Sequence, residues 1–290
     1  MWTLEKPDVD DVNQHLTRAL TYANGNPIYA LTGEERDRIA IVYQIYEEML
    51  GQASPALLAS NLSEDCRSAI KSAYAEVQIH GRLKELRSAL MVHVECCPLC
   101  GFGEVTQLDH YLPKDIYSAL AIYPRNLVPS CGPCNNAKRT HVASNDASRL
   151  IHAYYAVLPE RTFLVADVTM LNGGLDVTYR IDEHGIEEGL AQSLNFQLTR
   201  LKLNDRYPKQ INKFLSEQRP GVRRILNQSN PPQLLREYLE YSASDLDESF
   251  GLNDWRAALL RGLAASEEFC TEGVHAYFTR RRPQDNRRGK

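Results

Sequence analysis

The sequence predicts a mainly α-helical protein with a small β component. Apolar residues recur with helical spacing before residue 92 and again after residue 190, and two β-rich runs lie at residues 163–170 and 175–181. Between the helical regions, four cysteines form two Cys-x-x-Cys pairs, Cys97/Cys100 and Cys131/Cys134. We therefore expect a helical N-terminal region over residues 1–91, a cysteine-bracketed segment over 92–150, and a β-hairpin followed by helices over 151–290.

The N-terminal region is predicted to contain several helices with one buried face each. Thr32 and Glu35 have the spacing of a capping box, which opens a helix that Gly51 closes, and Ser63 is expected to cap the next helix. The residues expected on the two buried faces are Ile39, Val42, Tyr43, Tyr46, Met49 and Leu50, and then Cys66, Ala69, Ile70, Ala73, Tyr74 and Val77. The tyrosines at 43, 46 and 74 could stack on nucleic-acid bases, but their spacing favours core positions.

The four paired cysteines have the pattern of a structural zinc site. Four thiolates close the coordination sphere of Zn²⁺ and leave no position open for chemistry. We therefore expect Cys97, Cys100, Cys131 and Cys134 to hold one zinc ion that stabilises the fold. Any chemistry should then lie on the polar residues between and just after the two pairs.

Two alternative interpretations apply to these cysteines. They could be unligated thiols in a reducing cytosol. Alternatively, Cys131-Gly132-Pro133-Cys134 spells a thioredoxin-like dithiol. That chemistry requires the first cysteine at the end of a strand within a βαβ fold, and no run of parallel strands is predicted around it.

The cysteine segment resembles the HNH, or ββα-metal, nuclease family in its zinc-stapled variant. The elements that carry the resemblance are Leu108-Asp109-His110, Pro113, Asn126-Leu127-Val128-Pro129 and Cys134-Asn135-x-x-Lys138. The resemblance implies a finger of two strands and one helix that cleaves DNA with a divalent cation. Phosphodiester hydrolysis needs a deprotonated water, a cation against the phosphate oxygens, and donors that hold the phosphate.

The resemblance also implies roles for individual residues. His110 would be the general base, a task that suits the near-neutral pKa of histidine. Asp109 and Asn135 would be ligands of Mg²⁺ or Mn²⁺, which favour oxygen donors. Because neighbouring strand residues face opposite sides, Asp109 and His110 can serve one centre only where the strand ends or bends, and Pro113 is consistent with such a bend. A structural role is the alternative for each of the three.

Two further residues complete the candidate set. Asn126 is expected to bond backbone groups across the loop and brace the strand that carries Asp109 and His110. Lys138 lies three positions after Asn135, so both share a helix face, and Lys138 is a candidate phosphate contact; a solvated lysine is the alternative. Asn136 could exchange places with Asn135.

The C-terminal region is predicted to begin with a hairpin. Asn172-Gly173-Gly174 joins the two β-rich runs, and the second run alternates apolar and polar residues. Further helices are expected around residues 205–215, from Pro231 onward, and around Trp255–Leu263. No internal repeat or low-complexity linker separates these regions.

Composition limits the class of protein. The chain has 290 residues, 43% of them hydrophobic, which is enough for one large or two modest cores. No apolar run approaches the length of a membrane span, and the N-terminus has no secretory pattern. The cysteines outside the two pairs are Cys66, Cys96 and Cys270, an odd number that favours a reducing cytoplasm.

The negative net charge of the chain is unfavourable for binding DNA. The formal net charge is −4, so non-specific affinity should be modest. Residues 280–290 are rich in arginine and are a candidate contact for DNA or for an acidic partner, with a solvated tail as the alternative.

The amino-acid sequence of residues 110–114, 123–124 and 126–131 is also similar to that of the nuclease subunit of Septu-type anti-phage defence systems. In those systems a companion ABC/SMC-like ATPase binds and controls the nuclease. We therefore predict an HNH endonuclease that acts on DNA together with such an ATPase. A standalone restriction-type nuclease, a non-catalytic zinc module that binds DNA or acts as a scaffold, and a catalytic dithiol are the alternatives.

Overall fold

A computed structural model of the chain describes residues 3–279. It is mainly helical with two short antiparallel hairpins, which confirms the predicted fold class. The described residues form two compact units. We call residues 3–158 and 192–201 the finger unit, and residues 159–191 and 202–279 the hairpin unit. The arginine-rich residues 280–290 lie outside the described residues.

The finger unit begins with four helices: α1 (Val12–Ala19), α2 (Gly33–Glu48), α3 (Glu64–Ala73) and α4 (Lys84–Met91). Both predicted N-caps are present. The Thr32 hydroxyl accepts from the backbone N–H of Glu35 at 3.1 Å, while Glu35 accepts from the backbone N–H of Thr32 at 3.0 Å. The hydroxyl of Ser63 likewise accepts from the backbone N–H of Cys66 at 3.1 Å. These caps satisfy N–H groups that have no partner inside the helix.

One part of the predicted core is wrong. Ile39, Val42, Tyr43 and Tyr46 are buried, but the side chains of Met49 and Leu50 are exposed, at 38% and 50%. The physical reason is that α2 ends at Glu48, and Leu50 takes the left-handed backbone conformation with φ 49°. Helical spacing therefore stops before these two residues, and they leave the buried face.

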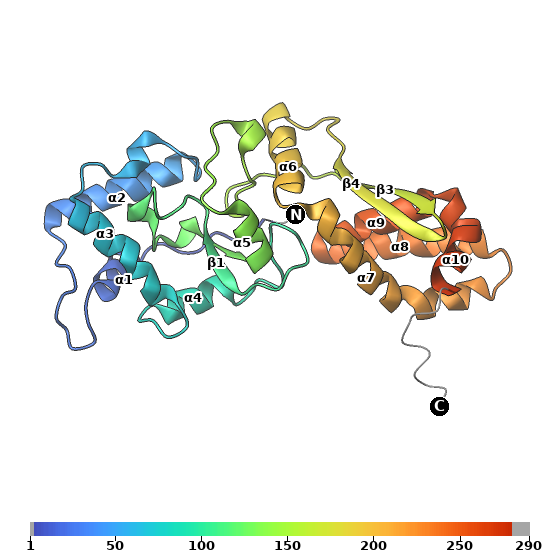
Figure 1. The fold of residues 1–290 in the computed structure, drawn as a ribbon, viewed down its shortest axis with the longest axis horizontal. Coiled ribbons are helices and arrows are strands. Elements are labelled where there is room, and N and C mark those ends of the chain that lie inside the picture. Colours follow the sequence, from blue (N-terminus) through green and yellow to red (C-terminus); the bar gives the residue numbers. More distant parts are fainter. Residues whose placement is uncertain (1–2, 280–290) are drawn as a thin grey trace. The chain divides into compact units, whose positions relative to one another are not determined.

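The finger itself consists of two strands and a helix. Strand β1 (Gln107–His110) pairs antiparallel with β2 (Leu127–Ser130), so that Asp109 lies opposite Val128 and His110 opposite Leu127. Helix α5 (Gly132–Lys138) follows β2 directly. In Figure 1, α5 lies beside β1, and α4 lies close below β1. Buried apolar residues from α2, α3, α4 and both strands join one hydrophobic core, so the N-terminal helices and the finger fold as one body.

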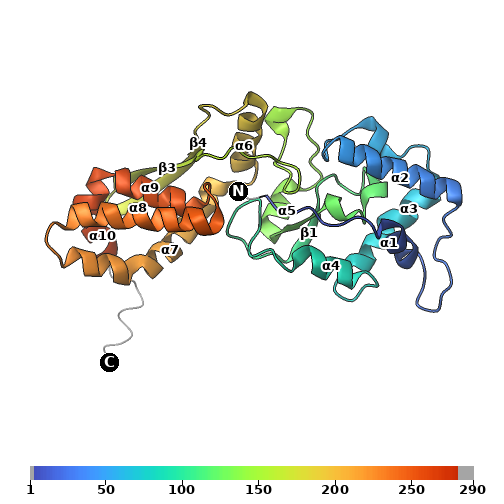
Figure 2. The same cartoon turned by 180° about the vertical axis from the view of Figure 1, so that it is seen from behind.

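The hairpin unit contains the second pair of strands, β3 (Leu164–Leu171) and β4 (Gly174–Ile181). Asn172 and Gly173 in the turn both have positive φ, 51° and 70°, which fits the predicted Asn-Gly hairpin turn. Helices α7 (Leu203–Leu226), α8 (Pro231–Phe250), α9 (Trp255–Ala265) and α10 (Val274–Thr279) follow. Figure 2 shows α8 alongside α9, and α9 packs on β3. A Cβ at Gly262 of α9 would lie 2.3 Å from the carbonyl oxygen of Ala166, so this close approach requires glycine.

Helix α6 (Glu188–Arg200) leads from the hairpin unit into the finger unit, where its residues from 192 onward belong. Gln197 is buried, and its amide accepts from the backbone N–H of Ile151 and donates to the carbonyl of Leu99, both at 3.0 Å. This helix thus ties the first cysteine pair to the segment that follows the finger. Among the described residues, no helix has both the length and the apolar composition of a membrane span.

Candidate functional site

The structure brings the four paired cysteines together. Their Sγ atoms all lie within 4.8 Å of one another, and all four side chains are buried. Cys97 and Cys100 lie on a tight loop before β1, whereas Cys131 precedes α5 and Cys134 lies in its first turn. None of the seven cysteines forms a disulfide. The cluster can hold a metal such as zinc.

The geometry of the cluster fits zinc. Zn–S bonds of about 2.3 Å in a tetrahedral site give sulfur–sulfur edges of about 3.8 Å, and the Sγ atoms of Cys100 and Cys131 are 3.8 Å apart. The other three thiols, Cys100 first and then Cys134 and Cys97, hold the pKa of Cys131 below its usual range because they donate hydrogen bonds to its thiolate. A thiolate is the form that binds a metal.

The loop around Cys100 is shaped by two glycines. Gly101 has φ 75°, in the left-handed region, and its N–H donates to the carbonyl of Cys97 at 2.8 Å. The N–H of Gly103 donates to Sγ of Cys100 at 3.3 Å. A Cβ at Gly103 would lie 2.6 Å from Sγ of Cys131, so any larger residue would push into the cluster.

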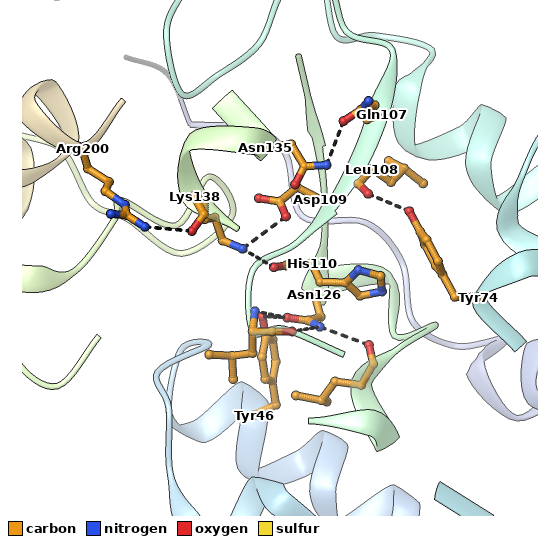
Figure 3. A network of polar contacts seen from close by, with 12 residues as sticks. Tyr46, Tyr74, Gln107, Leu108, Asp109, His110, Asn126, Asn135, Lys138 and Arg200 are labelled. Carbon is orange, nitrogen blue, oxygen red and sulfur yellow. Dashed lines mark hydrogen bonds and ion pairs between the residues drawn. The ribbon is translucent and has the colours of Figure 1, made fainter. Parts of the chain in front are cut away.

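Asp109 forms a buried ion pair with Lys138. One carboxylate oxygen lies 3.2 Å from Nζ of Lys138, and that ammonium also donates to the carbonyl of His110 at 2.5 Å (Figure 3). Their side chains are only 7% and 3% exposed. Burial raises the pKa of Asp109 to about 6, although Lys138 acts in the opposite direction, and burial lowers the pKa of Lys138. A phosphate could reach Lys138 only if this pair opens.

His110 is the last residue of β1, and its imidazole is buried. Its Nε2 lies 2.8 Å from the carbonyl oxygen of Ala121. Because a carbonyl can only accept, Nε2 carries the proton and Nδ1 is left with a free electron pair. Burial is the main reason that the pKa of His110 falls to about 4, so the ring is neutral at pH 7.

The candidate residues are gathered on β1 and α5, but they do not all point to one place. The side-chain amide of Asn135 donates to Oε1 of Gln107 at 2.8 Å, so both Asn135 and Lys138 face β1. In Figure 3 the carboxylate of Asp109 points toward Lys138, whereas the imidazole of His110 points the other way, toward Tyr74. Consecutive strand residues do face opposite sides.

Asn126 is fully buried and uses its whole amide in the loop between β1 and β2. It donates to the carbonyls of Leu112 at 3.0 Å and Leu120 at 3.1 Å, and it accepts from the N–H of Leu112 at 2.8 Å. The Tyr46 hydroxyl donates to the same oxygen at 3.2 Å. Leu120 directly precedes Ala121. Asn126 therefore holds in place the segment whose carbonyl, that of Ala121, accepts the hydrogen bond from Nε2 of His110.

Several residues that contact the candidate site could not be predicted from the local sequence. Tyr46 and His152 are 106 positions apart, and the Tyr46 hydroxyl lies 3.0 Å from Nε2 of His152. Gln107 could have been found, because strand alternation puts it on the same face as Asp109 two residues later. Arg200 of α6 donates to the carbonyl of Lys138 at 3.3 Å and thereby holds the end of α5 (Figure 3).

Comparison with known proteins finds two partial relatives. The chain is 29% identical over 192 residues to Protein ea31 of Escherichia phage lambda, a match that covers 60% of this chain and 63% of the phage protein. It is 37% identical over 70 residues to Septu protein PtuB of Bacillus thuringiensis, which covers 24% of this chain and 27% of that protein.

The chain therefore spans less than two thirds of the length of either relative. No protein-family model matches the chain, and no solved structure matches it.

Proposed function

We propose that this protein is a metal-dependent endonuclease of the HNH, or ββα-metal, kind that hydrolyses phosphodiester bonds in DNA. The observation that carries the proposal is the state of His110 at the end of β1 in a strand–strand–helix unit. Its Nε2 proton is committed to the carbonyl of Ala121, and its ring is neutral. Nδ1 can therefore accept a proton from water, as a general base must.

Asp109 and Asn135 are the proposed ligands of a divalent cation. A carboxylate and an amide oxygen are hard donors of the kind that Mg²⁺ and Mn²⁺ prefer. When bound, such a cation would stabilise negative charge on the phosphate oxygens. Lys138 now neutralises Asp109, so it must share or leave that carboxylate when a divalent ion binds. We assign the four cysteines a separate, structural zinc ion.

Cleavage of plasmid DNA tests this proposal. The purified, zinc-loaded protein should cleave in Mg²⁺ or Mn²⁺ and should not cleave when neither ion is added. Asp109→Asn removes the negative charge from the two proposed ligands and should abolish cleavage in Mg²⁺. Asp176→Asn changes an exposed carboxylate of β4 in the same way and should have no effect. If the folded protein leaves DNA intact in both Mg²⁺ and Mn²⁺, with and without the proposed ATPase partner, the non-catalytic zinc module is supported instead.

We also propose that the nuclease serves an anti-phage defence system and works with an ABC/SMC-like ATPase. The support is the partial likeness to the Septu protein PtuB. Cells that contain this protein and its ATPase should resist phage infection, and His110→Ala should remove that resistance while both proteins still co-purify. Full protection by the His110→Ala variant would contradict an effector role, and vigorous cleavage by the protein alone would favour a standalone restriction-type enzyme.

A further inference from the structure

A groove of about 610 Å³ lies within the finger unit between the N-terminal helices and the finger. One wall comes from α3, α4 and the turn between them, and the other comes from the start of β1, the loop after it and α5. The polar side chains used below are Lys71, Tyr74 and Arg87 on the first wall and Lys114, Asn135 and Asn136 on the second.

The groove is positively charged. Lys71, Arg87 and Lys114 line it, and within residues 3–279 none of the side chains that line it is acidic. The whole chain, by contrast, has a formal net charge of −4. A concentration of one sign of charge in a cleft raises the local concentration of oppositely charged ligands. The groove is therefore suited to an anion.

Two of these cations are available for an anionic ligand. The side chain of Arg87 is 8% exposed and donates to the carbonyl of Thr106 at 2.7 Å, but no carboxylate within residues 3–279 pairs with it. A buried, unneutralised cation is costly, and a bound phosphate would offset that cost. Lys71 pairs with Asp115 at 2.7 Å, but both side chains are about half exposed. Such surface pairs contribute little to stability, so a phosphate can replace the aspartate.

One lining residue of the groove, Tyr74, also contacts His110. The hydroxyl of Tyr74 donates to the carbonyl of Leu108 at 2.7 Å, and its ring centroid lies 4.3 Å from that of His110 (Figure 3). Nζ of Lys114 lies 5.9 Å from the same tyrosine ring. Asn135, a proposed metal ligand, forms part of the opposite wall. A strand in the groove would thus lie next to Tyr74, the ring that contacts the proposed general base.

We propose that this groove binds the phosphate backbone of the DNA strand to be cut. Lys71 and Arg87 come from the N-terminal helices and Lys114 from the finger, so the helical region supplies one wall of the substrate site. This inference rests on the proposed nuclease function, because it names where that substrate lies.

The test is a binding measurement that does not depend on cleavage. Fluorescence anisotropy of a labelled DNA oligonucleotide is followed on the zinc-loaded protein without added Mg²⁺ or Mn²⁺, with His110→Ala as the background and salt varied. Lys71→Gln and Lys114→Gln should each weaken binding several-fold and reduce the slope of log K against log salt by about 1. Lys84→Gln removes the same charge from an exposed position of α4 outside the groove and should leave affinity and slope unchanged.

The outcomes separate this inference from the nuclease proposal. If the double variant Lys71→Gln/Lys114→Gln retains the full affinity and salt slope of the background protein, or if the background protein does not bind DNA, the groove assignment is wrong. If the groove variants lose binding as expected but the wild-type protein never cleaves DNA, the groove stands and the nuclease proposal falls. Equal zinc content and circular dichroism of all variants exclude misfolding as the cause.

Discussion

The hydroxyl of Tyr46 connects two parts of the finger unit that lie far apart in the sequence, and its removal should have a measurable cost. The backbone N–H of Tyr154 donates to Nδ1 of His152 at 3.2 Å, so Nε2 carries the proton and donates to the Tyr46 oxygen at 3.0 Å. Tyr46 in turn donates its one proton to Oδ1 of Asn126 at 3.2 Å, a bond shared with the carbonyl of Arg125 at 3.3 Å. The Tyr46→Phe variant loses both bonds and leaves a buried N–H of His152 without a partner.

The magnitude follows from these two bonds. A typical intramolecular hydrogen bond contributes about 1 kcal/mol, and a buried donor without a partner costs about 1–3 kcal/mol. We therefore expect Tyr46→Phe to lower the free energy of unfolding by about 2–3 kcal/mol. Urea unfolding of the zinc-loaded protein measures this directly, provided that the transition of the finger unit is resolved.

Tyr43→Phe is the matched control. Tyr43 lies on the same helix, is also buried, and stacks on Tyr123 with ring centroids 4.2 Å apart. Within residues 3–279 its hydroxyl forms no hydrogen bond, so its loss should cost well under 1 kcal/mol. A double-mutant cycle with Asn126→Ala should show a coupling of about 1 kcal/mol with Tyr46→Phe. Equal effects of the two tyrosine variants, or a coupling near zero, would refute the proposed network.

Three further results are expected. The purified protein should hold about one tightly bound zinc ion per chain. The Cys131→Ser variant should lose this zinc, whereas the Cys96→Ser variant should keep it. Full zinc content in Cys131→Ser would contradict the four-cysteine site. Gly103→Ala should weaken zinc binding because its Cβ would lie 2.6 Å from Sγ of Cys131, whereas Gly33→Ala, whose Cβ meets nothing, should not. Burial lowers the pKa of His152 from 6.5 to about 3, so only the unfolded chain takes up this proton as the pH falls below 6.5. This group should therefore lower the free energy of unfolding by about 2 kcal/mol between pH 7 and pH 5. An equal pH dependence of the free energy of unfolding in His152→Gln would disprove this assignment.

Local signals in the sequence were sufficient for much of the fold. The capping box of Thr32 and Glu35 depends on a spacing of three residues, and the turn at Asn172-Gly173 depends on two residues that tolerate positive φ. Both are visible without knowledge of the tertiary structure. Helical spacing did not show that α2 stops at Glu48, because periodicity indicates which face is apolar but not where the chain leaves the helix.

The candidate site depends more on tertiary structure. The spacing of Asn135 and Lys138 indicates one shared helix face, but not that this face packs on β1 and buries the ammonium against Asp109. Neither a solvated lysine nor a free phosphate contact describes that state. The link from His152 through Tyr46 to Asn126 likewise exists only after the chain has folded.

The rate of plasmid cleavage by the His110→Ala variant, relative to wild type, tests the central claim most directly. Loss of a general base typically costs about 100- to 10,000-fold in rate, so we expect at least about a 100-fold decrease in Mg²⁺ at unchanged zinc content. His80→Ala, which alters an exposed histidine of the same unit, should cleave like wild type. Wild-type rates for the His110→Ala variant would show that this imidazole takes no part in hydrolysis.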